Sequence, residues 1–139
     1  MGLHHMQIGE VAEQTRLSLR TIRYYEEMGL VTPSARTSGG FRLYTESDVA
    51  RLRLIRSMKP LEFSLEEMRQ VLDVLDGLET TDPTGPEHDE LVDRLVGYRQ
   101  AADARVAALR EQLEVAEGFA ADLRRELGRQ KRTTTRQGS

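Results

Sequence analysis

Residues 18–29 read Ser-Leu-Arg-Thr-Ile-Arg-Tyr-Tyr-Glu-Glu-Met-Gly, and this stretch decides the fold of the chain. Apolar side chains recur along it at three-residue steps: Leu19, Ile22, Tyr25 and Met28. That spacing is typical of the buried face of a helix. Ser18 can cap the start of such a helix, and Gly29 can take the left-handed conformation that ends it. The stretch therefore predicts an amphipathic helix that runs through Met28.

A shorter helical pattern precedes this stretch. Its apolar or small side chains recur at helical spacing: Ile8, Val11, Ala12 and Thr15. Arg16 and Leu17 alone lie between this pattern and Ser18, and a linker of about three residues suits a helix-turn-helix. We expect the second helix of the pair to act as a recognition helix.

A wing is predicted after the two helices. Residues 32–40 are rich in proline, serine, threonine and glycine, and the pair Gly39-Gly40 is typical of a hairpin tip. A short strand is then predicted over residues 41–44, Phe-Arg-Leu-Tyr. The fold class expected from these elements is mainly α, with an N-terminal winged helix-turn-helix and a small β-hairpin wing.

Two further helices follow the wing. Thr45 and Asp48 form a capping-box pattern at the start of the first, which Pro60 ends. Its basic side chains are expected to lie in solvent or against the wing: Arg51, Arg53 and Arg56. Ser64 followed by Glu67 opens the second helix. We expect residues 1–76 to form one DNA-binding domain.

A long helix is predicted over residues 87–127, after a linker at residues 77–86. Apolar side chains step along it by three and four: Val106, Leu109, Leu113, Ala116, Ala120, Leu123 and Leu127. This heptad seam extends backwards through Ala102 and Leu95 and is interrupted at Arg99. Such a helix, about 60 Å long, is not stable alone in water with one apolar stripe exposed. The seam therefore predicts a partner helix and a homodimer.

Charge is segregated along the chain. The formal net charge is +2 over residues 1–63, −9 over residues 64–127 and +4 over residues 128–139. A basic bias in the N-terminal part can attract phosphate even though the whole chain carries −3, because the local field steers a ligand more than the sum does. We expect residues 128–139, which contain no large apolar side chain, to form a disordered basic tail.

Composition argues against several other kinds of protein. The chain has no cysteine, and its three histidines, His4, His5 and His88, do not have the spacing of metal ligands. We therefore expect no metal and no other cofactor. No recognisable set of acid, base and nucleophile predicts catalytic residues, so an enzyme is not expected. There is also no long apolar run and no signal sequence, so we expect a cytoplasmic protein without a membrane association.

The sequence resembles the MerR family of bacterial transcription regulators. The resemblance is carried by Arg-Tyr-Tyr-Glu-Glu-Met-Gly-Leu at 23–30, followed at wing distance by Gly-Phe-Arg-Leu-Tyr at 40–44. It is also carried by Ile-Gly-Glu-Val-Ala at 8–12 and by Phe-Ser-Leu-Glu-Glu-Met at 63–68, so that it covers residues 7–76. It implies a winged helix-turn-helix, a second helical wing, and a homodimer held by an antiparallel coiled coil.

The resemblance also implies a function and shows three departures from the family. Family members bind a pseudo-palindrome in double-stranded promoter DNA and, when activated, bend and untwist an over-long spacer so that RNA polymerase can use both promoter elements. Glu62 stands where the family usually has glycine, which costs about 1 kcal/mol if that position is left-handed. The sequence has none of the cysteines of metal and redox sensors, and we expect no appended ligand-binding domain. The sequence therefore leaves open whether an unknown small molecule acts as an effector.

Nine side chains are expected to contact DNA: Arg16, Ser18, Arg20, Thr21, Arg23, Tyr24, Arg36, Arg42 and Lys59. Arg20 is expected to read a base, because a guanidinium can pair bidentately with guanine. The Tyr24 hydroxyl is left for a phosphate, as the family resemblance suggests. Arg36 and Arg42 flank the wing tip, where cations contact the sugar-phosphate backbone. For the two cations outside the recognition helix and the wing, DNA contact and simple solvation are equally open.

Three alternative functions have to be weighed against a promoter-distorting regulator. An inducer-independent repressor would have the same sequence features. An architectural protein that only bends DNA would not need the long seam, and a coiled-coil scaffold would not need the Arg-Tyr-Tyr helix or the Gly-Gly wing. We therefore expect a sequence-specific regulator, with the repressor or the bending protein as the alternative.

The seam predicts that the protein is a dimer at micromolar concentration, with the mass measured by light scattering. Leu109→Asp or Leu113→Asp is expected to dissociate the dimer, because each change buries two uncompensated charges per dimer in the seam. A monomer mass for the unchanged protein would contradict both the coiled coil and a dimeric operator.

Overall fold

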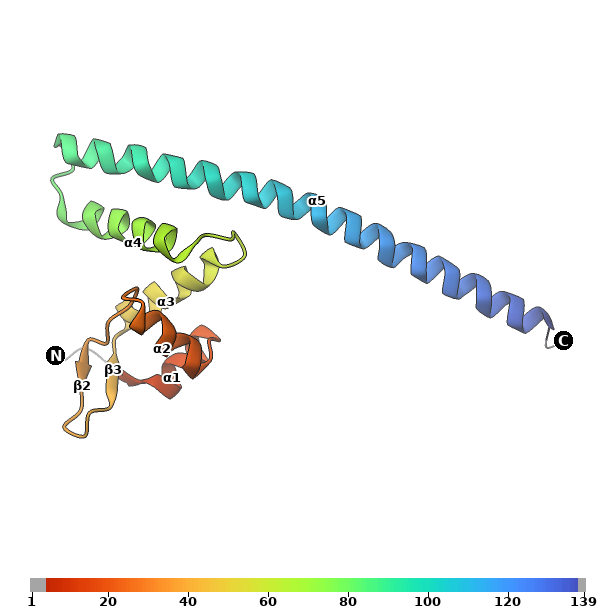
Figure 1. Cartoon of the computed structure of the whole chain (residues 1–139), viewed down its shortest axis with the longest axis horizontal. Coiled ribbons are helices and arrows are strands. Elements are labelled where there is room, and N and C mark those ends of the chain that lie inside the picture. Colours follow the sequence, from red (N-terminus) through yellow and green to blue (C-terminus); the bar gives the residue numbers. More distant parts are fainter. Residues whose placement is uncertain (1–4, 138–139) are drawn as a thin grey trace. The chain divides into compact units, whose positions relative to one another are not determined.

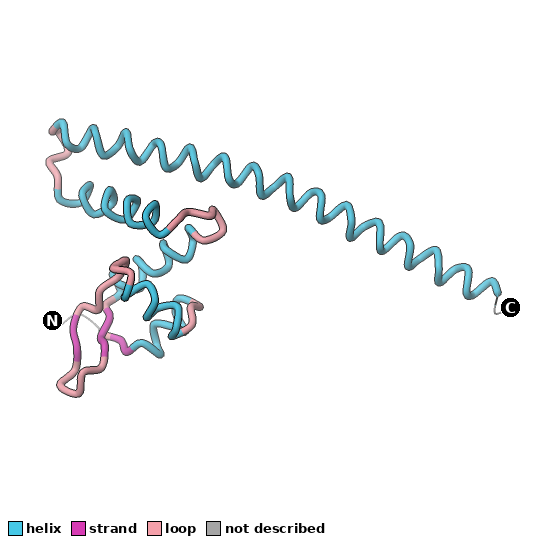
Figure 2. The backbone as a smooth tube through the Cα atoms, in the orientation of Figure 1, coloured by secondary structure: helices cyan, strands magenta, loops and turns pink. Residues whose placement is uncertain are grey.

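The structure is a computed structural model that describes residues 5–137, and it is mainly helical, as predicted (Figures 1 and 2). The elements follow in the order β1 (Met6–Gln7), α1 (Ile8–Thr15), α2 (Leu19–Glu27), β2 (Ala35–Arg36), β3 (Arg42–Tyr44), α3 (Glu46–Met58), α4 (Leu65–Thr80) and α5 (Pro86–Gln137). The chain divides into two compact units, residues 1–98 and residues 99–139. Each unit is described on its own.

Helices α1 and α2 form the predicted helix-turn-helix. Arg16 makes the turn in a left-handed conformation, with φ of 59°. The Thr15 hydroxyl donates to the Val11 carbonyl at 2.8 Å and accepts from the Leu17 amide at 3.3 Å, which fixes the end of α1. Ser18 caps α2 by accepting from the Thr21 amide at 3.0 Å, as the sequence predicted. The turn is therefore held by side chains as well as by the backbone.

The wing is a three-stranded antiparallel sheet in the order β1-β3-β2 (Figure 2). In the register of the sheet, Ala35 pairs with Leu43, and Met6 pairs with Tyr44. The sequence predicted the hairpin but not β1, because two residues are too short to carry an alternating pattern. Strand β3 begins at Arg42, one residue later than predicted, and Gly40 makes the turn before it with φ of 83°.

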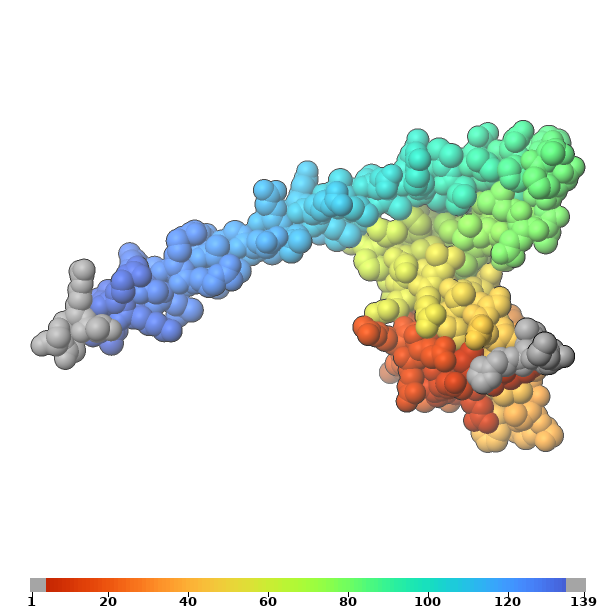
Figure 3. All heavy atoms as spheres, turned by 180° about the vertical axis from the view of Figure 1, so that it is seen from behind, coloured from red at the N-terminus to blue at the C-terminus, as the bar shows by residue number. Residues whose placement is uncertain are grey.

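The core of the first unit lies between α1, α2, α3, α4 and the sheet, and Figure 3 shows these elements as one packed body. Its largest fully buried side chains include Ile22, Leu30, Tyr44, Leu52, Ile55 and Leu72. The predicted capping box forms at Thr45 of α3, and Ser64, which was predicted to open α4, forms a second one with Glu67. The hydrophobic periodicity and the caps together account for where these helices start and which face each one buries.

Two arginines of α3 fix the packing of this core. Arg51 Nε donates to the Leu30 carbonyl at 2.7 Å, and its Nη1 pairs with Asp76 of α4 at 3.0 Å. Arg53 donates to the Gln14 carbonyl near the end of α1 at 3.2 Å. Arg51 therefore joins α3 to α4 and to the chain just after the end of α2, which the prediction did not include. Arg53 and Arg56 are exposed to solvent, as predicted.

The loop between α3 and α4 contains a strained residue. Glu62 has φ of 60°, so the left-handed conformation that a glycine would suit is present at this position. The Leu61 and Glu62 amides donate to the Met58 and Lys59 carbonyls at 3.2 Å and 3.0 Å. These hydrogen bonds hold a tight turn against the steric cost of a left-handed side chain.

Helix α5 begins at Pro86 and is longer than predicted. Because α4 continues to Thr80, the linker is residues 81–85 rather than 77–86. Helix α5 packs on α4 near its start, where a Cβ on Gly77 would come within 3.0 Å of Leu91. The Tyr98 hydroxyl also lies 3.1 Å from Gln70 Oε1. These contacts belong to the first unit.

The prediction of a disordered tail from residue 128 is wrong as far as Gln137, because α5 continues to that residue. The reason is local. Glu126 accepts from Arg129 at 2.7 Å and from Gln130 at 2.8 Å, which are the spacings that stabilise a helix surface. Low hydrophobicity predicted disorder, but arginine, glutamine and lysine are good helix formers.

The heptad seam of the second unit is solvent-exposed in the single chain. Leu113, for example, is 58% exposed, and Leu123 and Leu127 are exposed as well. Exposed leucines at heptad spacing over several turns are the pattern of a helix that packs against another helix. The antiparallel coiled coil itself stays a prediction.

Two negative findings concern the described residues 5–137. No helix within this range has a stretch that is both long and apolar enough to cross a membrane. The same residues contain no group of three or more histidine, aspartate or glutamate side chains that could hold a metal ion.

The strain at Glu62 predicts that Glu62→Gly raises the free energy of unfolding by about 0.5 to 1 kcal/mol. Glycine removes the steric cost of the left-handed backbone, which is partly offset by the greater freedom of glycine in the unfolded chain. Urea denaturation at one fixed protein concentration measures the change. Glu66→Gly, in the first turn of α4, is the control and should lower the same quantity by about 1 kcal/mol. Equal decreases in both variants would contradict the strain.

Candidate nucleic-acid interface

Helix α2 has one buried face and one exposed polar face. Ile22 and Tyr25 are buried, whereas Arg20, Arg23 and Tyr24 are exposed. The prediction that Tyr25 enters the core and Tyr24 does not is confirmed, because they are 2% and 44% exposed. The exposed side chains therefore come from consecutive turns of a short helix whose rotation is fixed by its buried face.

Two of the predicted contact residues are already engaged in the helix cap. Ser18 Oγ accepts from the Thr21 amide and donates to the Thr21 hydroxyl oxygen at 2.8 Å. Thr21 keeps one free hydroxyl hydrogen to offer, whereas the Ser18 oxygen is committed to the helix start. Their first effect is therefore to set the position of α2, and any contribution to DNA contact is secondary.

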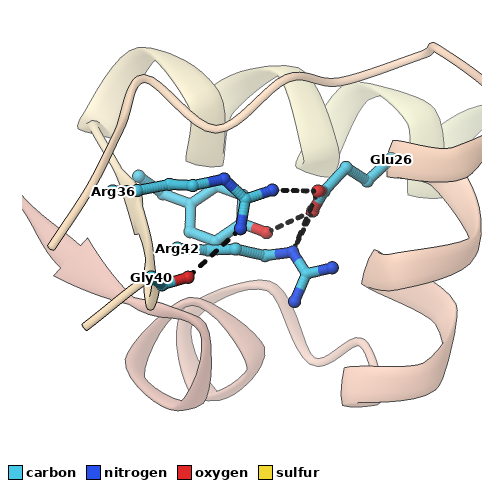
Figure 4. Close-up of polar contacts among 5 residues, drawn as sticks. Glu26, Arg36, Gly40 and Arg42 are labelled. Atoms are coloured by element: carbon cyan, nitrogen blue, oxygen red, sulfur yellow. Dashed lines mark hydrogen bonds and ion pairs between the residues drawn. The ribbon is translucent and has the colours of Figure 1, made fainter. Parts of the chain in front are cut away.

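Glu26 joins the recognition helix to the wing, and the sequence did not single it out. Its carboxylate accepts from Arg42 Nε of β3, at 2.9 Å to Oε1 and 2.8 Å to Oε2, and from the Tyr44 hydroxyl at 2.9 Å. Arg36 of β2 adds a longer contact, with Nη2 at 3.4 Å from Oε1 (Figure 4). The Glu26 side chain is only 14% exposed. One carboxylate thus ties both strands of the hairpin to α2.

The wing arginines therefore have a structural task as well as the predicted one. Arg36 Nη1 also donates to the Gly40 carbonyl at 3.2 Å, which braces the wing tip. In Figure 4 the terminal nitrogens of Arg42 point away from Glu26, and no dashed line reaches them. Arg42 can therefore hold the carboxylate with Nε and still present two donor nitrogens to a phosphate. The predicted phosphate contacts of both side chains remain predictions.

The pKa values of Arg42 and Tyr44, the two groups that donate to Glu26 from β3, are both raised. The hydrogen bond with Glu26 raises the pKa of Arg42 further above its usual value. Burial, and then the hydrogen bond with Glu26, raises the pKa of the Tyr44 hydroxyl. Arg42 is therefore a cation and Tyr44 a neutral donor at any pH near neutrality. Adjacent Glu27 is exposed, so only the tertiary contact distinguishes the two glutamates.

A hollow of about 410 Å³ lies between α2 and the loop after α3. Its lining residues are Arg20, Thr21, Tyr24, Tyr25, Lys59, Phe63, Leu65 and Met68. The hollow brings Lys59 to the same surface as Arg20 and Tyr24, which are far from it in the sequence. Arg16 lies exposed in the turn before α2. Of the two cations left open by the sequence, Lys59 is thus the one that shares a cavity with the recognition helix.

Comparison with protein families matches most of the described chain. The model described as "MerR HTH family regulatory protein" matches residues 6–75, and the model described as "MerR, DNA binding" matches residues 49–127. Together the two matches run from the first strand through the heptad seam. Regulators of transcription, not enzymes, make up this family.

Curated relatives match the N-terminal half of the chain. The HTH-type transcriptional regulator ZntR of Escherichia coli K12 is 48% identical over 68 residues, which are 49% of this chain and 48% of that protein. The mercuric resistance operon regulatory protein of Bacillus cereus is 41% identical over 70 residues, 50% of this chain and 53% of the relative. The chain therefore spans about half the length of these relatives.

Solved structures extend the similarity into α5. A MerR family transcriptional regulator from Bacillus cereus is 32% identical and has a TM-score of 0.56, covering 84% of this chain and 76% of that one. HiNmlR, a MerR family regulator lacking the sensor domain and bound to promoter DNA, has a TM-score of 0.63 at 21% identity, covering 85% of this chain and 89% of that one. The second likeness concerns the fold alone.

The contacts of Glu26 predict that Glu26→Ala lowers the free energy of unfolding by about 1 to 3 kcal/mol. The change leaves the buried Tyr44 hydroxyl without its acceptor and removes the ion pair with Arg42. Urea denaturation measures the decrease.

Glu27→Ala is the matched control for this prediction, because Glu27 is the exposed neighbour, and its effect should stay within about 0.5 kcal/mol. In the double variant with Tyr44→Phe, the combined decrease should be smaller than the sum of the two single decreases. Equal effects at both glutamates, or full additivity with Tyr44→Phe, would mean that Glu26 does not hold the wing.

Proposed function

Because the chain belongs to the MerR family of helix-turn-helix regulators, we propose that it binds a pseudo-palindromic promoter site as a homodimer and regulates transcription by distorting that site. As a member of this family it is a DNA-binding transcription regulator. The dimer, the operator symmetry and the distortion are the proposed part.

The observation that carries the proposal is the fixed relation between α2 and the wing. Buried Ile22 and Tyr25 set which face of α2 is exposed, and Glu26 anchors the hairpin to the same helix. A recognition helix in the major groove and a wing along the backbone have to approach DNA together, so a rigid link between them lowers the entropic cost of binding. Arg20 and Arg23 then face base edges, while Tyr24 faces a phosphate.

The dimer is supported by the exposed seam of α5. A homodimer would cover the seam leucines and bring two recognition helices to one duplex, which is how a two-fold protein reads a palindromic site. Leu113→Asp should dissociate the dimer, whereas Ala107→Asp adds the same charge off the seam and should leave it intact. The seam leucine and the control alanine are both exposed in the single chain.

The effect on transcription follows from the same geometry. A dimer that holds both half-sites can bend and untwist the DNA between them at a cost repaid by its contacts. RNA polymerase can then contact both promoter elements, although the spacer between them is too long. A repressor that needs no inducer is the second candidate, and the lack of cysteine in the sequence favours it, since thiolate sensing by the chain itself is excluded.

A direct test begins with a genome-wide footprint of the tagged protein, followed by transcription from one bound promoter in vitro. We expect a symmetric footprint over the spacer, and we expect a shortened spacer to make transcription independent of the protein. Transcription that only falls when the protein is added, at every spacer length, would favour the inducer-independent repressor. The absence of any sequence preference would contradict a sequence-specific regulator.

We expect Arg20 to contact a base and Lys59 to contact a phosphate, so their substitution should have different effects on DNA binding. Arg20→Ala should cost about 1 to 3 kcal/mol on the operator and relax selectivity at one position in each half-site. Lys59→Gln should weaken operator and random duplex alike and make the salt dependence shallower by about one unit for each phosphate that it no longer neutralises. Arg42→Ala is a less specific test of phosphate contact, because it also removes the ion pair with Glu26.

Binding is titrated against operator and scrambled duplex at several salt concentrations. Arg110→Gln removes an exposed cation of α5 and is the control. It should change neither the sequence preference nor the salt dependence of DNA binding. A change of sequence preference in Lys59→Gln together with a pure salt effect in Arg20→Ala would reverse the assignment.

A further inference from the structure

The hollow between α2 and the α3–α4 loop has an apolar interior and a cationic edge. Its interior is formed by Tyr25, Phe63, Leu65 and Met68. Arg20 and Lys59 are exposed at its edge. Its volume, about 410 Å³, is within the range of sites that hold small organic ligands. A flat contact with a phosphate would use the cations and leave the apolar interior empty.

We propose that this hollow binds a small aromatic carboxylate, and that the ligand competes with DNA for the recognition helix. The aromatic ring lies against Tyr24, Tyr25 and Phe63, and the carboxylate lies between Arg20 and Lys59. The competition rests on the proposed function, whereas the binding of the ligand does not.

The aromatic residues of the hollow account for the choice of an aromatic ligand. The Tyr24 and Tyr25 rings have centroids 5.9 Å apart and are inclined by 53°, so they form two walls of different orientation. Phe63 supplies a third ring and is only partly buried. Aromatic rings prefer tilted and offset contacts with one another, so a flat ring fits such walls better than a flexible chain does.

The loop that carries Phe63 is shaped for this position. The left-handed Glu62 turns the chain directly before Phe63, and the Ser64 cap starts α4 directly after it. A strained residue in a cavity loop is often retained because the site needs that geometry. The hollow is therefore formed by a defined turn and two capped helices.

Competition follows from the shared side chains. Arg20, Thr21 and Tyr24 line the hollow and also form part of the proposed DNA-contacting face of α2. A carboxylate between Arg20 and Lys59 occupies the cations that a backbone phosphate or a base would use. Binding is then mutually exclusive, and the ligand acts as an inhibitor of DNA binding without any change in the coil.

The test uses the full-length protein and 2-naphthoate as the probe, with neutral 2-naphthamide as its matched analogue. Amide and side-chain NMR shifts are followed in the absence of DNA. We expect saturable binding of 2-naphthoate with a dissociation constant of about 1 mM or lower, shifts centred on the hollow, and weaker binding of the amide. No saturation with 2-naphthoate, or shifts centred elsewhere, would overturn the site.

Variants separate the parts of the site. Lys59→Gln should weaken 2-naphthoate about fivefold or more and leave the amide unchanged, while Phe63→Leu should weaken both ligands without unfolding the loop. Arg56→Gln removes an exposed cation of α3 that does not line the hollow. It should leave the affinity for both ligands unchanged. Equal effects of Lys59→Gln and Arg56→Gln would overturn the carboxylate contact.

Competition is measured separately, by titrating duplex DNA into protein with and without 2-naphthoate. At a ligand concentration ten times its own dissociation constant, each free hollow is made about tenfold rarer. The apparent dissociation constant for a duplex that both protomers of the proposed dimer contact should therefore rise about a hundredfold. Ligand binding with unchanged DNA affinity would overturn the competition. Ligand binding by a protein that binds no duplex would contradict the proposed function and leave the site standing, so the two failures are distinguishable.

Discussion

A single carboxylate, that of Glu26, links helix α2 of this regulator to its wing. Glu26 leaves α2 on the side of the wing and accepts from Arg42 and Tyr44, which lie on one strand of the hairpin. Because the side chain is mostly buried, water competes weakly for these hydrogen bonds. The core packing of Met6 and Tyr44 also attaches the sheet to the helices, but among the described residues only the Glu26 contact pairs the charges of the wing with α2.

The same helix also forms a wall of the hollow, so its two sides have different surroundings. On the wing side, opposite charges are paired and fixed. On the side of the α3–α4 loop, Arg20 and Lys59 are exposed and stand beside aromatic rings. Paired cations keep their positions, whereas exposed cations beside an apolar surface are available to an anion. The cations on the wing side of α2 are thus partly engaged within the protein, whereas Arg20 and Lys59 are exposed.

Helix α5 depends on a different constraint. Its seam leaves leucines exposed that a single helix cannot bury, and ion pairs such as Glu126 with Arg129 support the helix locally. Such pairs contribute a few tenths of a kcal/mol each at an exposed helix surface. They are enough to continue the helix beyond the last leucine of the seam, but they do not replace a partner for the seam itself.

The sequence alone determined the local elements, because their signals lie within a few residues of one another. The caps at Ser18, Thr45 and Ser64, the period of α2 and the heptads of α5 were all readable, and they gave the winged helix-turn-helix and the family resemblance. Tertiary structure decided what depends on contacts between distant residues. Glu26 could not be told from Glu27, and the cavity shared by Arg20 and Lys59 could not be seen, because neither contact has a fixed spacing in sequence.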